Sequence, residues 1–196
     1  MMRLTLRNRI YPPIHGWKRK NGSTLANSNT KTILSRIWIS SNWIINSYSE
    51  FEQYIGKELG VSDYLRITQK QINKFADATL DHQWIHLDKE RAKKESPYGT
   101  TIAHGYLTLS ILPYLWEQMI QVNNIKMLVN YGIDNLKFIQ PVLVDSEVRL
   151  KAKLNSLINL KGIIKAEINV ILEIKDNKKP ALHASLIFLY HFNWLN

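Results

Sequence analysis

The 196 residues suffice for one domain with a sizeable core, and 45% apolar and 21% charged residues are ordinary for a globular protein. The lack of cysteine excludes disulfides, thiolate metal sites and a cysteine nucleophile. The sequence contains no run of about 18 uncharged apolar residues, so no transmembrane helix is predicted. The net charge of +10 comes mostly from residues 1–49, which carry eight basic side chains and no acidic one.

This basic leader keeps no helical or strand period over residues 1–32 and is interpreted as a poorly ordered extension. A transit peptide and a polyanion-binding segment are the alternatives, so the expected location is cytoplasmic, or the mitochondrial matrix if the leader directs import. Apolar residues at helical spacing over 33–47 suggest a partly helical part. The chain is therefore divided into an extension, residues 1–48, and a domain, residues 49–196.

Two short helices are expected at the start of the domain. Ser49 is expected to cap the first, with Glu52 at the capping-box position, and Thr68 the second, with Gln71 three residues later. Residues 80–102 follow without strong periodicity, but they are dense in Asp, His and aromatic side chains. We therefore expect a functional loop there.

Residues 103–121 form the longest apolar helix candidate, and the helix has so little polar face that it should be buried on most sides. Pro113 must kink or divide this helix. Four strand-like segments follow, at residues 133–139, 147–157, 163–174 and 182–192. An antiparallel sheet wrapped around a buried central helix satisfies this order, and the predicted fold class is α+β.

Asp81 and His86 lie just past the end of the second helix and are the strongest candidates for chemistry. In a loop, this spacing can bring a carboxylate and an imidazole to one water molecule, and imidazole titrates near neutral pH. Each residue alone would more often be structural, as a turn cap or a core histidine. His82 and His86 also form an H-x3-H pair, but no helix, adjacent Glu or third ligand supports it, and we predict no metal.

Residues 81–86 resemble the signature of the MaoC-like, (R)-specific enoyl-CoA hydratase family, in which an aliphatic residue, here Ile85, precedes the catalytic His. Residues 96–110 match a second family segment, in which a His-Gly pair, here His104-Gly105, opens the central helix. More narrowly, residues 56–62, 81–86 and 101–110 resemble the nodulation protein N branch, and residues 130–132 and 138–142 fit it too. The resemblance extends from about residue 50 to 192.

The resemblance implies a hot-dog fold and the addition of water to a trans-2-enoyl thioester, giving the (R)-3-hydroxyacyl thioester, or the reverse. It implies that Asp81 and His86 are the catalytic pair and that the Gly105 amide binds the thioester oxygen. The acyl group would be carried by CoA or an acyl-carrier protein, so no separate cofactor is expected. It also implies a homodimer, and no nucleic-acid partner is expected. Further substrate-binding candidates are Trp84, Tyr98, Gly99, His104 and Lys137.

The sequence departs from the family pattern at three places. Leu80 stands where the family usually has Gly, and would carry strain if its φ is positive. Gln83-Trp84 replaces Asn-Pro, and Lys137 replaces an Arg that could bind phosphate through two nitrogens.

Three other functions are possible for this sequence. They are a hot-dog module that binds acyl thioesters without catalysis, a thioesterase on the same fold, and a polyanion-binding protein using residues 1–49. A basic cluster beside the loop is either a solvated face or a recognition site for CoA phosphates or an acidic carrier protein, and comprises Lys89, Arg91, Lys93 and Lys94.

Overall fold

The structure, a computed structural model, describes residues 43–193. The expectations for residues 1–42 lie outside the described residues. None of the helices within residues 43–193 is long and apolar enough to cross a membrane. In chain order, the elements are β1 (Trp43–Ile45), α1 (Tyr48–Glu52), β2 (Glu58–Val61), β3 (Leu65–Arg66), α2 (Gln69–Thr79), α3 (Trp84–Leu87), α4 (Lys89–Glu95), α5 (Gly105–Ser110), α6 (Leu112–Met119), β4 (Ile120–Val122), β5 (Ile125–Phe138), β6 (Glu147–Leu160), β7 (Ile163–Ile174) and β8 (Leu182–Phe192).

One antiparallel sheet organises the domain, with strand order β2-β6-β7-β8-β5 and with β3 also paired to β6. Buried residues alternate along β6 and β7, because successive side chains of a strand point to opposite faces. The three strands predicted in the last 50 residues are confirmed as β6, β7 and β8. β5 begins at Ile125, well before the predicted residue 133, because an edge strand with register shifts shows no clean alternation.

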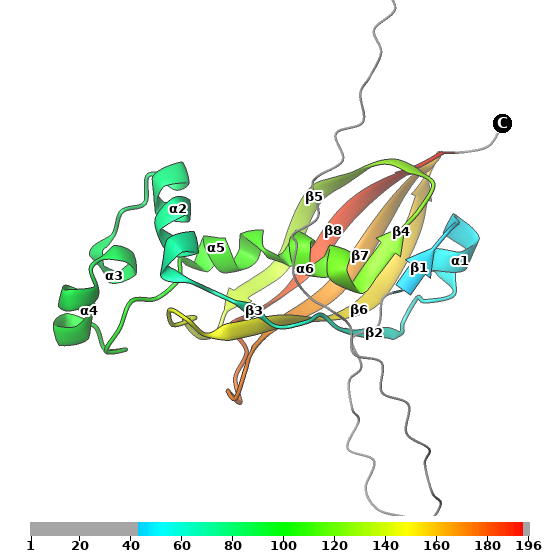
Figure 1. Cartoon of the computed structure of the whole chain (residues 1–196). Coiled ribbons are helices and arrows are strands. Elements are labelled where there is room, and N and C mark those ends of the chain that lie inside the picture. The colour runs from blue at the N-terminus through cyan, green and yellow to red at the C-terminus, as the bar shows by residue number, and fades with distance from the viewer. Residues whose placement is uncertain (1–42, 194–196) are drawn as a thin grey trace, which may run out of the picture. The chain divides into compact units, whose positions relative to one another are not determined.

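The central helix lies along one face of this sheet, as Figure 1 shows for α5 and α6. It is divided at Ile111, as Pro113 predicted, and Pro113 occupies the first turn of α6. The fully buried Trp116 donates from Nε1 to the Tyr190 hydroxyl at 2.8 Å, which joins α6 to β8. The expected burial on most sides is wrong for the single chain, since Tyr106 is 68% and Tyr114 52% exposed. The sheet covers one side of the helix and leaves the other open.

Several short elements were not predicted, because three or four residues carry too little periodicity. The segment predicted as helix up to residue 47 forms β1 at Trp43–Ile45, which pairs in parallel with β4. The Trp43 indole donates to the Leu59 carbonyl at 2.8 Å, so residues assigned to the extension belong to the fold. Ser47, not Ser49, caps α1 and accepts the Glu50 amide, because the helix starts two residues earlier than expected.

Candidate active site

The site lies at one end of the central helix, where α2, α3 and the first turn of α5 meet. α2 begins as predicted, because Thr68 and Gln71 form a reciprocal capping box. It ends at Leu80, whose φ of 61° is left-handed and whose side chain is 81% exposed. The predicted strain at this position is confirmed, and a non-glycine residue in this conformation costs about 1–2 kcal/mol. The left-handed turn sends the chain directly into Asp81.

Two helices occupy the region expected to be a loop, so that expectation is wrong in part. His86 lies on α3, and Asp88 caps α4 by accepting the Arg91 amide at 2.9 Å. α4 gave no hydrophobic signal because Ala92 is its only buried residue. The Asp88 cap and the i,i+4 pair between Arg91 and Glu95 were the available sequence signals.

His86 is 8% exposed, and its hydrogen-bonding fixes its tautomer. Nδ1 lies 2.8 Å from the Ile102 carbonyl oxygen, which can only accept, so Nδ1 carries the hydrogen and the neutral ring presents a lone pair at Nε2. Burial lowers the pKa of His86 below its ordinary value of 6.5, and His104 lowers it further, against the Ile102 hydrogen bond and Asp81. His86 is therefore suited to accept a proton at neutral pH.

His104 packs directly against His86. The two rings are stacked with centroids 3.7 Å apart and planes 26° apart, and Phe75 approaches the His104 ring at 5.1 Å. His104 is 2% exposed, and its Nε2 donates to the main-chain oxygen of Asp81 at 2.9 Å. His104, a substrate-binding candidate from the sequence, is therefore tied to the turn that carries Asp81.

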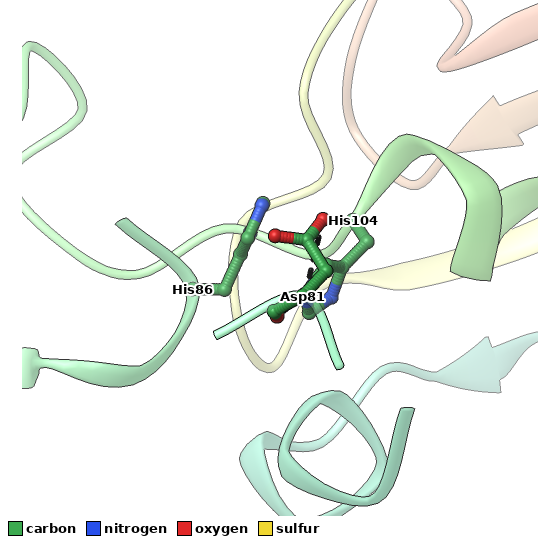
Figure 2. Close-up of side chains that lie close together, drawn as sticks. All are labelled: Asp81, His86 and His104. Atoms are coloured by element: carbon green, nitrogen blue, oxygen red, sulfur yellow. Dashed lines mark hydrogen bonds and ion pairs between the residues drawn. The ribbon is translucent and has the colours of Figure 1, made fainter. Parts of the chain in front are cut away.

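The Asp81 carboxylate stands beside both imidazoles (Figure 2). Its side chain is 55% exposed, and Oδ2 lies 3.9 Å from Nε2 of His104. Asp81 contributes a carboxylate oxygen, and His86 and His104 each contribute a ring nitrogen, to a group of three atoms that lie within 4.8 Å of one another. Two groups at this separation can hold one water molecule between them. The structure thus brings together the carboxylate and the imidazole that the sequence paired.

Gly105 begins α5 and faces the same pocket as His86, a cavity of about 270 Å³. A Cβ at this position would lie 3.3 Å from the Phe138 ring, so a side chain would press on it. The Gly105 N–H makes no hydrogen bond to any residue between 43 and 193 and remains available to a ligand. The pocket is lined by His86, Ile102, Ala103, Gly105, Thr108, Phe138, Ile139, Gln140, Pro141 and Val142.

None of the five tentative substrate-binding residues lines this pocket, and His104 packs against the His86 ring instead. The Trp84 ring packs under the Arg91 guanidinium at 4.4 Å, while Tyr98 and Gly99 lie in the turn after α4. Lys137 is exposed on β5, where its side chain points away from that of its neighbour Phe138. Their roles in binding stay predictions.

The residues that sequence reasoning missed come mainly from residues 138–142, which comprise the last residue of β5 and the segment after it. This segment was matched to the family without being given a role. Thr108 also lines the pocket, and its hydroxyl donates to the Gly105 carbonyl at 2.6 Å. Helical spacing of three from Gly105 was the signal that could have identified Thr108.

A half-buried glutamine, Gln69, links the elements of the site and was not predicted. Nε2 of Gln69, the first residue of α2, donates to the His86 carbonyl at 2.7 Å. Oε1 of Gln69 accepts from the hydroxyl of the fully buried Thr101 at 2.6 Å. Gln69 thereby joins α2 to α3 and to the segment leading into α5.

The H-x3-H pair does not form, because His82 instead contacts the Asp77 carboxylate at 3.1 Å. The Asp81, His86 and His104 group is close enough for an ion. However, two of its four imidazole nitrogens already donate to carbonyl oxygens, and the stacked rings do not converge on a point. The absence of a metal stays a prediction.

Comparison with known proteins agrees with the family resemblance found in the sequence. Residues 50–175 match the family described as MaoC like domain. The chain is 43% identical over 145 residues to 3-hydroxyacyl-thioester dehydratase Z of Mycobacterium tuberculosis (strain ATCC 25618 / H37Rv), covering 74% of this chain and 95% of that protein. It is 42% identical over 149 residues to nodulation protein N of Rhizobium meliloti (strain 1021), covering 75% and 92%. The solved structure of the (R)-hydratase from A. caviae shares the fold, with a TM-score of 0.52, 23% identity and coverage of 65% and 94%.

Proposed function

Because this chain belongs to the MaoC-like dehydratase family, we propose that it is a lyase that adds water to a trans-2-enoyl thioester, giving the (R)-3-hydroxyacyl thioester, or removes it. The predicted hot-dog fold is confirmed. One observation carries the assignment of the site: Asp81 and His86 lie within reach of one water molecule, and His86 shares its pocket with the free Gly105 N–H.

In the hydration direction, the Asp81 carboxylate and Nε2 of His86 position a water molecule, and one of them removes its proton. The water oxygen forms a bond to Cβ of the enoyl group, and electrons move to the thioester oxygen as an enolate forms. A proton then returns to Cα, so the sum of substrate and water equals the product. The Gly105 N–H stabilises the enolate oxygen, since a donor aimed at developing charge is worth roughly 3 kcal/mol. Dehydration follows the same steps in reverse.

The test is hydration of crotonyl-CoA, followed as the loss of enoyl-thioester absorbance, with Asp81→Asn and His86→Ala. Each substitution should lower kcat by about 10²–10⁴-fold, because each removes a group that transfers or orients the proton. His82→Gln is the matched control, since His82 is exposed and contacts Asp77. Full activity in either site variant would contradict the assignment. No activity in the folded wild-type protein, with short or long enoyl-CoA or with enoyl-carrier protein, would favour a thioester-binding module.

Leu80, which stands where the family usually has Gly, does not favour a non-catalytic module. Leu80 adopts the left-handed conformation itself, and Asp81 still lies beside His86 and His104. Its strain is therefore a cost in stability and does not displace the carboxylate.

The substrate brings its own carrier, CoA or phosphopantetheine, so we propose no further cofactor. Activity is expected to be unchanged after dialysis against a chelator, and loss of activity restored by a divalent ion would contradict this.

We also propose a cytoplasmic location, with the mitochondrial matrix as the alternative. Both rest on the predicted chemistry and on the composition of the leader.

The proposed assembly is a homodimer that covers β5 and the open side of the central helix. β5 pairs only with β8 within the described chain, so its outer main-chain groups are open to another strand. Exposed apolar side chains gather on these two elements: Met127, Val129, Tyr131, Ile133 and Phe138 on β5, and Tyr106 and Tyr114 on α5 and α6.

Light scattering should give twice the chain mass for wild type and a smaller mass for Ile133→Lys. Ile158→Lys, at a similarly exposed apolar site on β6, should leave the mass unchanged. A monomeric wild-type protein would contradict the proposal.

A further inference from the structure

His104 contacts both proposed catalytic residues, because it donates to the main chain of Asp81 and stacks on the ring of His86. Its ring contacts Phe75 on α2 and the ring of His86 on α3, and it occupies the N-cap position of α5. Through these contacts one side chain joins the three elements that make the site. The mechanism above gives His104 no part in proton transfer.

The hydrogen bond from His104 to Asp81 supports a turn that is strained and poorly packed. Asp81 follows Leu80, whose left-handed main chain is strained and whose side chain is too exposed to hold the turn by packing. In the described part of the chain, the only hydrogen bond to the Asp81 carbonyl comes from Nε2 of His104. Without this bond, the turn and its carboxylate would be free to relax away from His86.

The stacking contact acts on the second reacting group. Centroids 3.7 Å apart leave no room for the His86 ring to tilt toward His104. The Ile102 carbonyl holds Nδ1 of the same ring, so the direction of Nε2 is set from two sides. The charged or titratable groups acting on His86 are His104, from the start of α5, and Asp81, from the turn after α2.

We propose that His104 is a positioning residue for the hydratase reaction. Its Nε2–H fixes the main chain of Asp81, and its ring backs the ring of His86, so that carboxylate and imidazole share one water molecule. This role rests on the proposed function. A His104 that only fills the core would tolerate any side chain of similar volume, whereas a positioning residue requires the donor at Nε2.

Two substitutions separate these roles. His104→Gln keeps an N–H donor near the place of Nε2 but loses the ring, and His104→Phe keeps a ring but loses the donor. We expect His104→Phe to lower kcat by about 10–100-fold with KM within about 3-fold, because small misplacements of reacting groups cost up to about 10²-fold. His104→Gln should recover part of that loss, because it restores the donor to Asp81 but not the ring stacked on His86. Equal kcat in wild type and His104→Phe, or a Gln variant no better than the Phe variant, would overturn the proposal.

A second measurement needs no substrate. Both variants lack the imidazole of His104, so they should differ at His86 mainly through the position of Asp81, which raises the pKa of His86. NMR titration should therefore give a higher His86 pKa in His104→Gln than in His104→Phe. The difference should vanish when Asp81→Asn is added to both.

A difference that is absent, or that persists in the Asp81→Asn background, would overturn the positioning role. Failure of the wild-type protein to hydrate any enoyl thioester would instead overturn the proposed function, because the titration is independent of turnover. Thermal unfolding of all four variants shows that each measurement is made on folded protein.

Discussion

The sheet with α6 and the segment from α2 to the start of α5 are held together in different ways. In the sheet, buried aliphatic residues alternate along β6 and β7, and they pack against buried side chains of α6. In the α2–α5 segment, the main links are polar: Gln69 to the His86 carbonyl, His86 to Ile102, and His104 to Asp81. The first region makes the fold stable, and the second fixes directions at the site.

Because of this difference, substitutions in the two regions should affect stability and activity unequally. Apolar packing is non-directional and roughly proportional to buried area, whereas a hydrogen bond is short and depends on angle. Substitutions in the sheet and α6 should therefore reduce stability first. Substitutions among the polar links should reduce activity more than stability.

The largest effect on stability is expected for Trp116→Ala. Trp116 is fully buried on α6, and its indole N–H donates to Tyr190. Removing it leaves a cavity and should lower the free energy of unfolding by about 3–5 kcal/mol. Chemical denaturation measures this, and Glu117→Ala, at the exposed neighbouring position, should change it by less than about 0.5 kcal/mol. A loss below about 1 kcal/mol for Trp116→Ala would show that α6 is not central to the core.

Gln69→Ala is expected to reduce activity more than stability. The buried Thr101 hydroxyl and the His86 carbonyl each lose a partner, which should cost about 1–3 kcal/mol of stability. Because α3 is no longer tied to α2, we expect kcat for enoyl-CoA hydration to fall by about 10–100-fold. Lys70→Ala, one residue further along α2 and exposed, is the control. Unchanged kcat would show that the polar links do not position His86.

The dependence on pH should reveal the environment of His86. Burial lowers its pKa, so the neutral form that can accept a proton persists below the ordinary value of 6.5. The acid limb of kcat/KM is therefore expected to have its midpoint below pH 6.5. Stability should also fall as pH drops from 6.5 through the lowered pKa, because the unfolded chain binds this proton more readily. A midpoint above pH 6.5 would contradict a neutral His86 in the active protein.

The smallest effect is expected for Leu80→Gly, which should raise the free energy of unfolding by about 0.5–1 kcal/mol. Glycine removes the strain of the left-handed conformation, and its greater freedom in the unfolded chain offsets part of the gain. Thr79→Gly, at the last helical residue of α2, should instead lower stability by about 0.5–1 kcal/mol. Thermal unfolding of the pair distinguishes local strain from a general effect of glycine.

Much of the fold could be predicted because its signals are local. Alternation located β6, β7 and β8, the Thr68 and Gln71 pair located the start of α2, and Pro113 located the break in the central helix. Short strands such as β1 and β4 could not be predicted, since their pairing joins residues far apart in the sequence. The exposed face of α5 and α6 was also misjudged, because apolar composition does not say which side this chain covers.

By itself, the sequence determined the chemistry that was available: one carboxylate and one imidazole five residues apart, and a glycine at the start of the central helix. Only the tertiary structure decided how they meet. Gln69, Thr101, Ile102 and the segment after β5 come from distant parts of the chain, and they set the tautomer of His86 and the walls of its pocket. The reason is physical: residue types are set locally, whereas directions and burial depend on contacts between elements that no local pattern records.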